Sequence, residues 1–134
     1  MFFYPRIYVD TILDISYEYL KENNIQAVIL DMDNTLIDFN MNVIKGGKKW
    51  CDSLREKGIK LLIVSNSNKK EKLEKVSKEL NIDYISFAMK PLKKGFKKAI
   101  KQLNLKPQNI AAIGDQVFTD VIRCKPCKII FNFS

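Results

Sequence analysis

Four short apolar runs recur along the chain, and the segments between them carry apolar residues at every third or fourth position. Continuous apolar runs predict buried strands, and the three-to-four spacing predicts amphipathic helices. The predicted strands are 27–31, 61–64, 84–89 and 110–114, and the predicted helices are 17–21, 45–57, 66–80 and 91–106. Strands that alternate with helices in this way indicate right-handed β-α-β units and a three-layer α/β/α, Rossmann-like parallel sheet.

The 134 residues are enough for one domain, 1–134, in which a core of 25–134 follows an N-terminal arm of 1–24. The arm mixes aromatic and charged residues and is expected to pack over the sheet, with an aromatic foothold on lipid as the alternative. Leu36–Val43 is expected to form a small flap. No apolar stretch approaches the length of a membrane span, which predicts a soluble, cytoplasmic protein.

Charge and composition limit the partners and the types of catalysis that are compatible with the sequence. The chain has 23 basic and 15 acidic residues, so its formal charge of +8 favours anionic partners, although a compositional bias of the source explains the lysines equally well. The absence of histidine excludes Ser-His-Asp and Cys-His catalysis and His-ligated zinc. Three cysteines suit a reducing compartment, and Cys124 and Cys127 form a C-x-x-C pair that lacks the second pair of a zinc site.

Polar residues follow each predicted strand. Asp31 and Asp33 follow the first, Ser65 the second, Lys90 the third and Asp115 the fourth. Because ligands of a parallel α/β sheet bind beyond the carboxyl ends of its strands, these residues are expected to converge at one edge. Carboxylates, a hydroxyl and a lysine together favour magnesium-assisted phosphoryl chemistry.

The same residues resemble a known family. In chain order, Asp31-x-Asp33-x-Thr35, then Ser65, then Lys90-Pro91, then Gly114-Asp115 with Asp120, resemble the four motifs of the haloacid dehalogenase superfamily. The details are similar to the YqeG-like phosphatases of subclass IIIA, whose more distant mitochondrial relatives are phosphatidylglycerophosphate phosphatases. The resemblance covers about residues 8–121.

The resemblance implies a role for each motif residue. Asp31 would be the nucleophile that forms an aspartyl-phosphate, Asp33 the general acid and base, and Lys90 a stabiliser of transition-state charge. The implied Mg²⁺ ligands are Asp31, Asp33, Asp115 and Asp120. The implied substrate-binding residues are Thr35, Ser65, Asn66 and Lys90.

The intervals between motifs are too short for a cap domain, so the resemblance implies an open site. In related phosphatases without a cap, an open site goes with a bulky phosphorylated substrate or with an oligomer that supplies the cover. The distant relatives suggest a phospholipid headgroup, with peripheral contact to a membrane. No feature predicts a specific nucleic-acid partner.

The pattern departs from the family after Asp120, where residues 121–127 replace a glycine-rich turn. Lys128–Phe133 suits a strand, but the chain is expected to be truncated there, to lack a covering helix and to expose an apolar face or strand edge. Two alternatives to a phosphatase stay open: a catalytically silent binding or regulatory protein of the same fold, and a receiver-like signalling module. The order of acidic residues along the strands disfavours the receiver.

Overall fold

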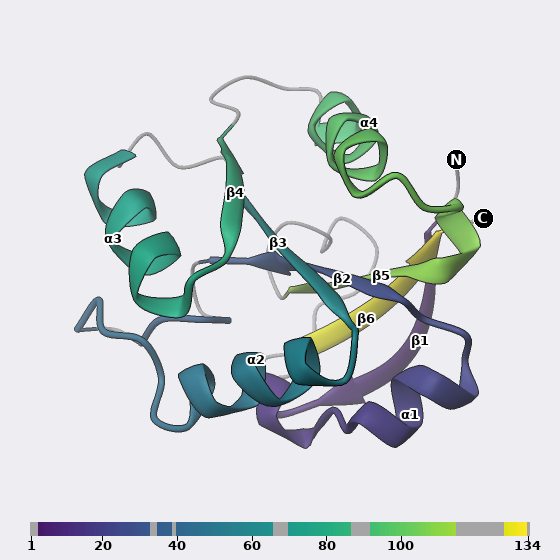
Figure 1. Ribbon diagram of the computed structural model, residues 1–134, viewed down its shortest axis with the longest axis horizontal. Coiled ribbons are helices and arrows are strands. Elements are labelled where there is room, and N and C mark those ends of the chain that lie inside the picture. The colour runs from purple at the N-terminus through teal and green to yellow at the C-terminus, as the bar shows by residue number, and fades with distance from the viewer. Residues whose placement is uncertain are drawn as a thin grey trace.

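Among the residues that the structure describes, six strands form one sheet in the order β1-β6-β5-β2-β3-β4 (Figure 1). The computed structural model describes residues 3–32, 35–38, 40–65, 70–86, 92–114 and 128–133. The strands are β1 (Phe3–Val9), β2 (Ala27–Asp31), β3 (Lys60–Ser65), β4 (Asp83–Ser86), β5 (Ile110–Gly114) and β6 (Lys128–Phe133). The helices are α1 (Tyr17–Glu22), α2 (Gly47–Glu56), α3 (Lys70–Leu80) and α4 (Leu92–Leu103), with 3-10 turns η1 (Ile12–Asp14) and η2 (Pro107–Asn109).

Strands β2 to β5 are mutually parallel, as the sequence predicts. The steps from β2 to β3 and from β3 to β4 move in one direction, so right-handed crossovers place α2 and α3 on the same face. The return from β4 to β5 runs the other way, which places α4 on the opposite face. The two core clusters agree: one packs α1, α2 and α3 against the sheet, and the other packs α4. The predicted three-layer α/β/α architecture is therefore confirmed.

The helix ends follow local sequence signals. The hydroxyl of Ser16 accepts a hydrogen bond of 3.1 Å from the Tyr19 backbone N–H and caps α1. Helix α2 ends at a cap on Lys57, and Gly58 then takes a φ of +89°, the left-handed conformation that glycine adopts without strain. Helix α3 buries Leu73, Val76 and Leu80, which recur at the three-to-four spacing of an amphipathic helix.

The N-terminal segment differs from the arm that the sequence predicts. Phe3–Val9 does not lie over the sheet but joins it as β1, antiparallel to β6, with a register shift between Pro5 and Ile7. The predicted strand at Lys128–Phe133 is confirmed as β6, which is also antiparallel to β5. An exposed edge on that strand is a wrong prediction, because β6 is hydrogen bonded to a neighbour on both sides.

Residues 11–22 are also integrated into the core. The Trp50 indole N–H on α2 donates a hydrogen bond of 2.9 Å to the Ile15 carbonyl. Leu20 on α1 is fully buried in the cluster that α2 and α3 share. This segment therefore packs as part of the domain.

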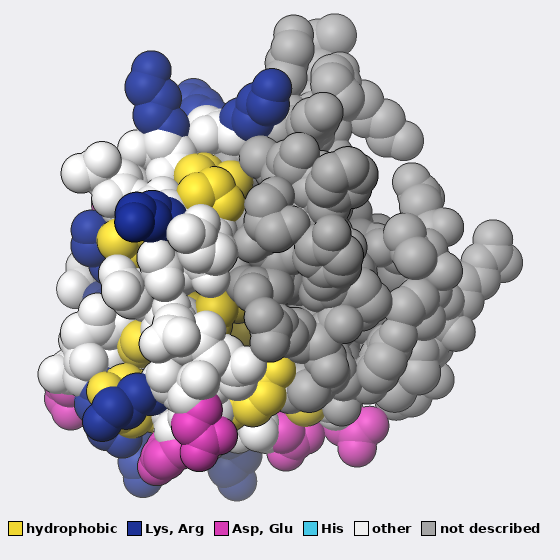
Figure 2. Space-filling view, turned by 90° about the vertical axis from the view of Figure 1, so that its right-hand side faces the viewer, with side chains coloured by type: hydrophobic (Ala, Val, Ile, Leu, Met, Phe, Trp, Pro, Cys, Tyr) yellow, Lys and Arg dark blue, Asp and Glu magenta, His cyan; other side chains and the backbone are white. Residues whose placement is uncertain are grey.

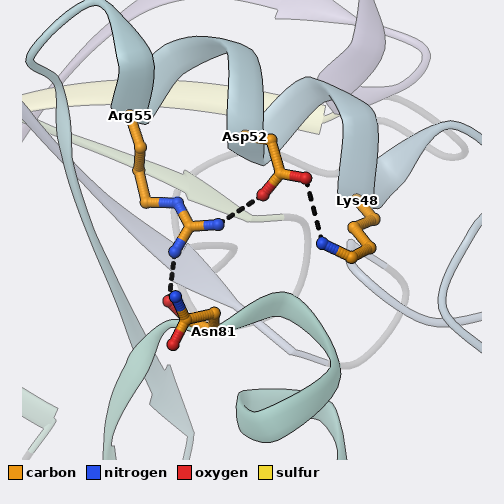
Figure 3. Close-up of polar contacts among 4 residues, drawn as sticks. All are labelled: Lys48, Asp52, Arg55 and Asn81. Carbon is orange, nitrogen blue, oxygen red and sulfur yellow. Dashed lines mark hydrogen bonds and ion pairs between the residues drawn. The ribbon is translucent and has the colours of Figure 1, made fainter.

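A polar clamp joins α2 to α3 (Figure 3). The Arg55 guanidinium donates to the backbone carbonyl of Asn81, just after α3, and to the Asp52 carboxylate. Lys48 Nζ also lies 3.0 Å from Asp52 Oδ2. Hydrogen bonds from Lys48 and Arg55 lower the pKa of Asp52, so the stability that this carboxylate contributes is present above its unfolded-state pKa and is lost as the pH falls.

We expect the Arg55→Ala variant to lose about 1.5 kcal/mol of unfolding free energy, because a charged donor to a carbonyl is removed from a side chain that is 27% exposed. Lys48→Ala removes an ion pair on the same helix whose lysine side chain is 56% exposed, and it should change stability by less than about 0.5 kcal/mol. Urea unfolding of both variants tests the comparison. Equal losses of unfolding free energy in the two variants would contradict a stabilising role for the Arg55 contacts.

Cys51 is buried in α2, and burial raises the pKa of its thiol to about 12. At pH 8 only about one thiol in 10⁴ is then ionised, and the thiolate is the reactive form. We expect iodoacetamide to leave Cys51 unmodified in the native protein at pH 8 and to alkylate it in urea, as peptide mass spectrometry would show. Alkylation of Cys51 under native conditions would contradict this. Cys124 and Cys127 lie outside the described residues.

Candidate active site

Asp31 is the last residue of β2, the strand at the centre of the parallel group. It pairs with Val64 on β3, while Leu30 before it pairs with Ile113 on β5. The chain leaves β2 toward β3 on one side and reaches β5 on the other only after β4, so Asp31 stands where the strand order reverses. Ligands of open α/β sheets bind at this switch point. Asp31 is only 5% exposed, so its position is fixed by the sheet.

The loop after β2 is closely curled. The Met32 carbonyl accepts hydrogen bonds from the backbone N–H groups of Thr35, Leu36 and Ile37, at 3.4, 3.0 and 3.3 Å. Thr35 is 1% exposed, and its hydroxyl oxygen has no hydrogen-bond partner among the described residues. A buried hydroxyl without a partner typically costs 1–3 kcal/mol, so this oxygen suits a partner that the described residues do not supply.

Ser65 ends the neighbouring strand β3 and is 1% exposed. It comes one residue after Val64, the register partner of Asp31, and itself pairs with Ser86 at the end of β4. Adjacent strands lie about 4.8 Å apart, so Asp31 and Ser65 belong to one small region of the carboxyl edge. A carboxylate can act as a nucleophile toward a phosphoryl group, and a hydroxyl can donate a hydrogen bond to its oxygens.

The structure therefore describes three of the predicted site residues: Asp31 and Ser65 at the carboxyl ends of adjacent strands, and Thr35 in the loop after β2. The others lie outside the described residues: Asp33, Asn66, Lys90, Asp115 and Asp120. For two of them, the preceding residue is the last residue of a described strand. Ser65 directly precedes Asn66, and Gly114, at the end of β5, directly precedes Asp115.

The predicted flap is a small hairpin. Ile37 and Val43 form an antiparallel bridge, and the Asp38 carboxylate accepts hydrogen bonds from the backbone N–H groups of Asn40 and Asn42, at 2.8 and 3.0 Å. Between β2 and α2 the described residues contain this hairpin and no cap domain. The site is thus bordered on this side by a short loop.

The structure adds one residue that the sequence analysis did not select. The Lys72 ammonium on α3 contacts the thioether sulfur of Met41, which lies in the hairpin with a φ of +67° and is exposed. The two residues are 31 positions apart, and no local pattern predicts their contact. Lys72 connects the flap to α3.

Asp31, Thr35 and Ser65, the described residues of the site, offer only oxygen atoms as side-chain ligands for a metal ion. Mg²⁺ prefers oxygen ligands. Asp31 is the one predicted metal ligand within the described residues. Those residues contain no group of three His, Cys, Asp or Glu side chains able to hold a metal ion. The donor chemistry of Asp31 nevertheless fits a hard divalent cation.

A comparison with known families identifies the class of protein to which this fold belongs. Residues 42–125 match the model of the haloacid dehalogenase-like hydrolases. The chain belongs to this family, and the resemblance drawn from the four motifs is confirmed.

The chain is also similar to individual phosphatases. The chain is 38% identical over 122 residues to "Probable phosphatase YqeG" of Bacillus subtilis (strain 168), covering 90% of this chain and 70% of that protein. It is 26% identical over 121 residues to "Glyceraldehyde 3-phosphate phosphatase" of Pyrococcus furiosus, covering 84% of this chain and 49% of that protein. The predicted similarity to the YqeG-like group is confirmed, while the chain spans only about half of the archaeal relative.

Solved structures share the fold. The 3-deoxy-D-manno-octulosonate 8-phosphate phosphatase of Yersinia pestis aligns with a TM-score of 0.61 and 18% identity, over 86% of this chain and 69% of that one. The corresponding enzyme of Moraxella catarrhalis, in complex with a magnesium ion, a phosphate ion and a KDO molecule, aligns with a TM-score of 0.58 and 18% identity, over 75% and 64%. In the described part of this chain, no helix has the length and apolar character needed to span a membrane.

Proposed function

We propose that the chain is a Mg²⁺-dependent phosphomonoester hydrolase that acts through an aspartyl-phosphate on Asp31. The observation that supports this most is the placement of a buried carboxylate at the switch point of the sheet, on a strand whose neighbour ends at Ser65. Family membership and the names of the relatives support the same chemistry.

In the proposed reaction, a carboxylate oxygen of Asp31 forms a bond to phosphorus while the bond from phosphorus to the ester oxygen breaks. Asp33 donates a proton to the departing alkoxide. A water molecule then attacks the phosphorus, Asp33 takes a proton from that water, and the bond to Asp31 breaks to release phosphate.

Other residues would stabilise charge. Ser65 and the backbone of Asn66 would donate hydrogen bonds to the phosphoryl oxygens, and the Lys90 ammonium would offset the charge that develops on them. Thr35 would orient the loop that carries Asp31. Asp31, Asp33, Asp115 and Asp120 would hold Mg²⁺, which neutralises phosphate charge when bound.

The proposed substrates are phosphorylated small molecules, because the relatives are named for sugar and triose phosphates. A phospholipid headgroup phosphate is a narrower proposal, favoured by the small flap and the net charge of +8. Hydrolysis of phosphatidylglycerophosphate in vesicles, compared with glyceraldehyde 3-phosphate, separates these proposals. Release of phosphate from the small molecule alone would contradict the proposal that the substrate is a phospholipid headgroup.

Hydrolysis of p-nitrophenyl phosphate tests the proposed chemistry. We expect turnover with added Mg²⁺, loss of turnover in EDTA, and recovery when Mg²⁺ is returned in excess. Recovery shows that EDTA removed a cation and did not damage the fold. Turnover that continues unchanged in EDTA would contradict metal dependence, and no turnover from a folded sample would favour a binding role.

A further inference from the structure

A cavity of about 350 Å³ lies at the opposite edge of the sheet from Asp31. It is lined by Gln26, just before β2, and by Ile59 and Lys60, where β3 begins. β2 spans five residues, so this cavity lies roughly 13 Å from Asp31 along the strand. A ligand here would not occupy the candidate active site.

Three lysines line this cavity: Lys21, Lys57 and Lys60. No acidic residue is among the described residues that line it. Lys57 Nζ lies 5.0 Å from the centre of the Tyr17 ring, a cation–π contact with another lining residue. Lys60 Nζ donates one hydrogen bond of 3.2 Å to the Leu103 carbonyl, and an ammonium carries two further N–H donors.

Helix dipoles reduce this positive charge without reversing it. Lys21 lies in the last turn of α1, Lys57 caps α2, and Lys60 bonds the last residue of α4. Each helix C-terminus carries roughly −0.5 charge, so three of them contribute at most about −1.5 against +3 from the lysines. The cavity therefore remains positive.

Figure 2 faces this side of the molecule, the right-hand side of Figure 1, where the segments that lead into β2 and β5 lie. In the described part of the face, basic side chains lie among neutral ones, and acidic side chains gather along the lower rim. Hydrophobic side chains appear there as small separate patches. The described part of this face thus offers positive charge and shows no large apolar surface for a protein partner.

The cavity also has an apolar component, because the buried residues Ile25 and Ile59 line it together with Leu105. Its volume lies within the range of about 300–1,000 Å³ that is typical of small-molecule sites. A cavity with apolar lining and three ammonium groups suits a ligand with a phosphate and an apolar portion. We propose that this lysine cavity is a second, non-catalytic site that binds an organic phosphate.

Phenylphosphonate is a suitable probe, because it carries a phosphoryl group on an apolar ring and has no ester bond to hydrolyse. Titrated in EDTA into the ¹⁵N-labelled full chain, it should cause saturable shifts of the Gln26 and Gly58 amide signals, both from residues that line the cavity. The absence of saturable shifts at these two amides would overturn the proposal. A response at Asp31 alone would do so as well, and it would leave the proposed phosphatase function intact.

The charge dependence is tested with two triple variants. Lys21→Gln/Lys57→Gln/Lys60→Gln should weaken phenylphosphonate binding at the Gly58 amide by about tenfold or more. The control replaces three exposed lysines on α3 and α4 that do not line the cavity, and it should retain affinity: Lys75→Gln/Lys78→Gln/Lys97→Gln. Equal weakening in both variants would overturn the proposal, since it would show a general effect of net charge.

Co-sedimentation distinguishes the source of the phosphate. Binding to phosphatidylglycerol vesicles that only the cavity variant loses would assign the phosphate to a lipid headgroup. Phenylphosphonate binding without such sedimentation would assign it to a free organic phosphate. Phenylphosphonate affinity that persists in the cavity variant would overturn the proposal from either source. Unchanged thermal unfolding of both variants is the folding control.

Discussion

Asp31→Asn is expected to lower kcat for p-nitrophenyl phosphate by at least about 10³-fold, a loss of roughly 4 kcal/mol of transition-state stabilisation. Asparagine has almost the same shape as aspartate but cannot serve as the nucleophile. Asp31 is buried at the end of β2 and is placed by pairing with β3, so the substitution tests chemistry with little change of packing. Mg²⁺-dependent initial rates give the measurement.

Asp83→Asn is the matched control. Asp83 is an exposed aspartate at the amino end of β4, at the opposite edge of the sheet, and its substitution should leave kcat within about twofold of the parent value. A phosphoenzyme trapped by acid quench should be absent from Asp31→Asn and present in Asp83→Asn. Appreciable turnover by folded Asp31→Asn would contradict the assignment of the nucleophile.

Leu20→Ala is expected to reduce the free energy of unfolding by about 3 kcal/mol, the usual size for a fully buried leucine. Leu20 has no exposed surface and packs in the cluster that α1, α2 and α3 share. The substitution therefore tests whether residues 1–24 belong to the cooperative unit or form a separable arm. Urea unfolding, followed by circular dichroism, gives the free energy and its denaturant slope.

Leu13→Ala is the control for this prediction, because Leu13 lies in the same segment with 40% of its surface exposed. We expect it to cost less than about 1 kcal/mol. A similar small effect for Leu20→Ala would show that the N-terminal segment contributes little, and the description of 1–24 as an arm would then hold.

The parallel strands β2, β3 and β5 were predictable because they are buried on both faces and therefore form continuous apolar runs. All five residues of β2 and all five of β5 are buried. The helices were predictable from their periodicity, and Gly58 from its place after the last helical turn. Each of these signals lies within one short segment of the sequence, so it can be recognised without the three-dimensional structure.

Strand β1 was not predictable in the same way. Pro5 and Arg6 interrupt its apolar pattern, and the register shift between Pro5 and Ile7 breaks strict alternation. Proline has no N–H to donate and is therefore typical of edge strands, where a ladder hydrogen bond can be missing. Pro5 thus interrupts the apolar pattern of β1 but suits the position of β1 at the edge of the sheet. Its partner, β6, is distant in sequence.

For the candidate site, the sequence predicted that polar residues follow four strand ends, and the structure places Asp31 and Ser65 at one edge of the sheet. Burial of Thr35 was less evident, because it depends on three backbone hydrogen bonds to one carbonyl, that of Met32. Roles for Asp33, Asn66, Lys90, Asp115 and Asp120 stay predictions. The contact of Lys72 with Met41 required three-dimensional information.

The order of the sheet has a consequence for synthesis on the ribosome. Among the described strands, β1 is hydrogen bonded only to β6, which is made more than a hundred residues later. At about 5–20 residues per second, β1 emerges several seconds before its partner exists. During this interval the nascent chain presents an unpaired strand that other chains can bind. Chaperone occupancy on nascent chains should therefore fall only once residues 128–133 have left the exit tunnel.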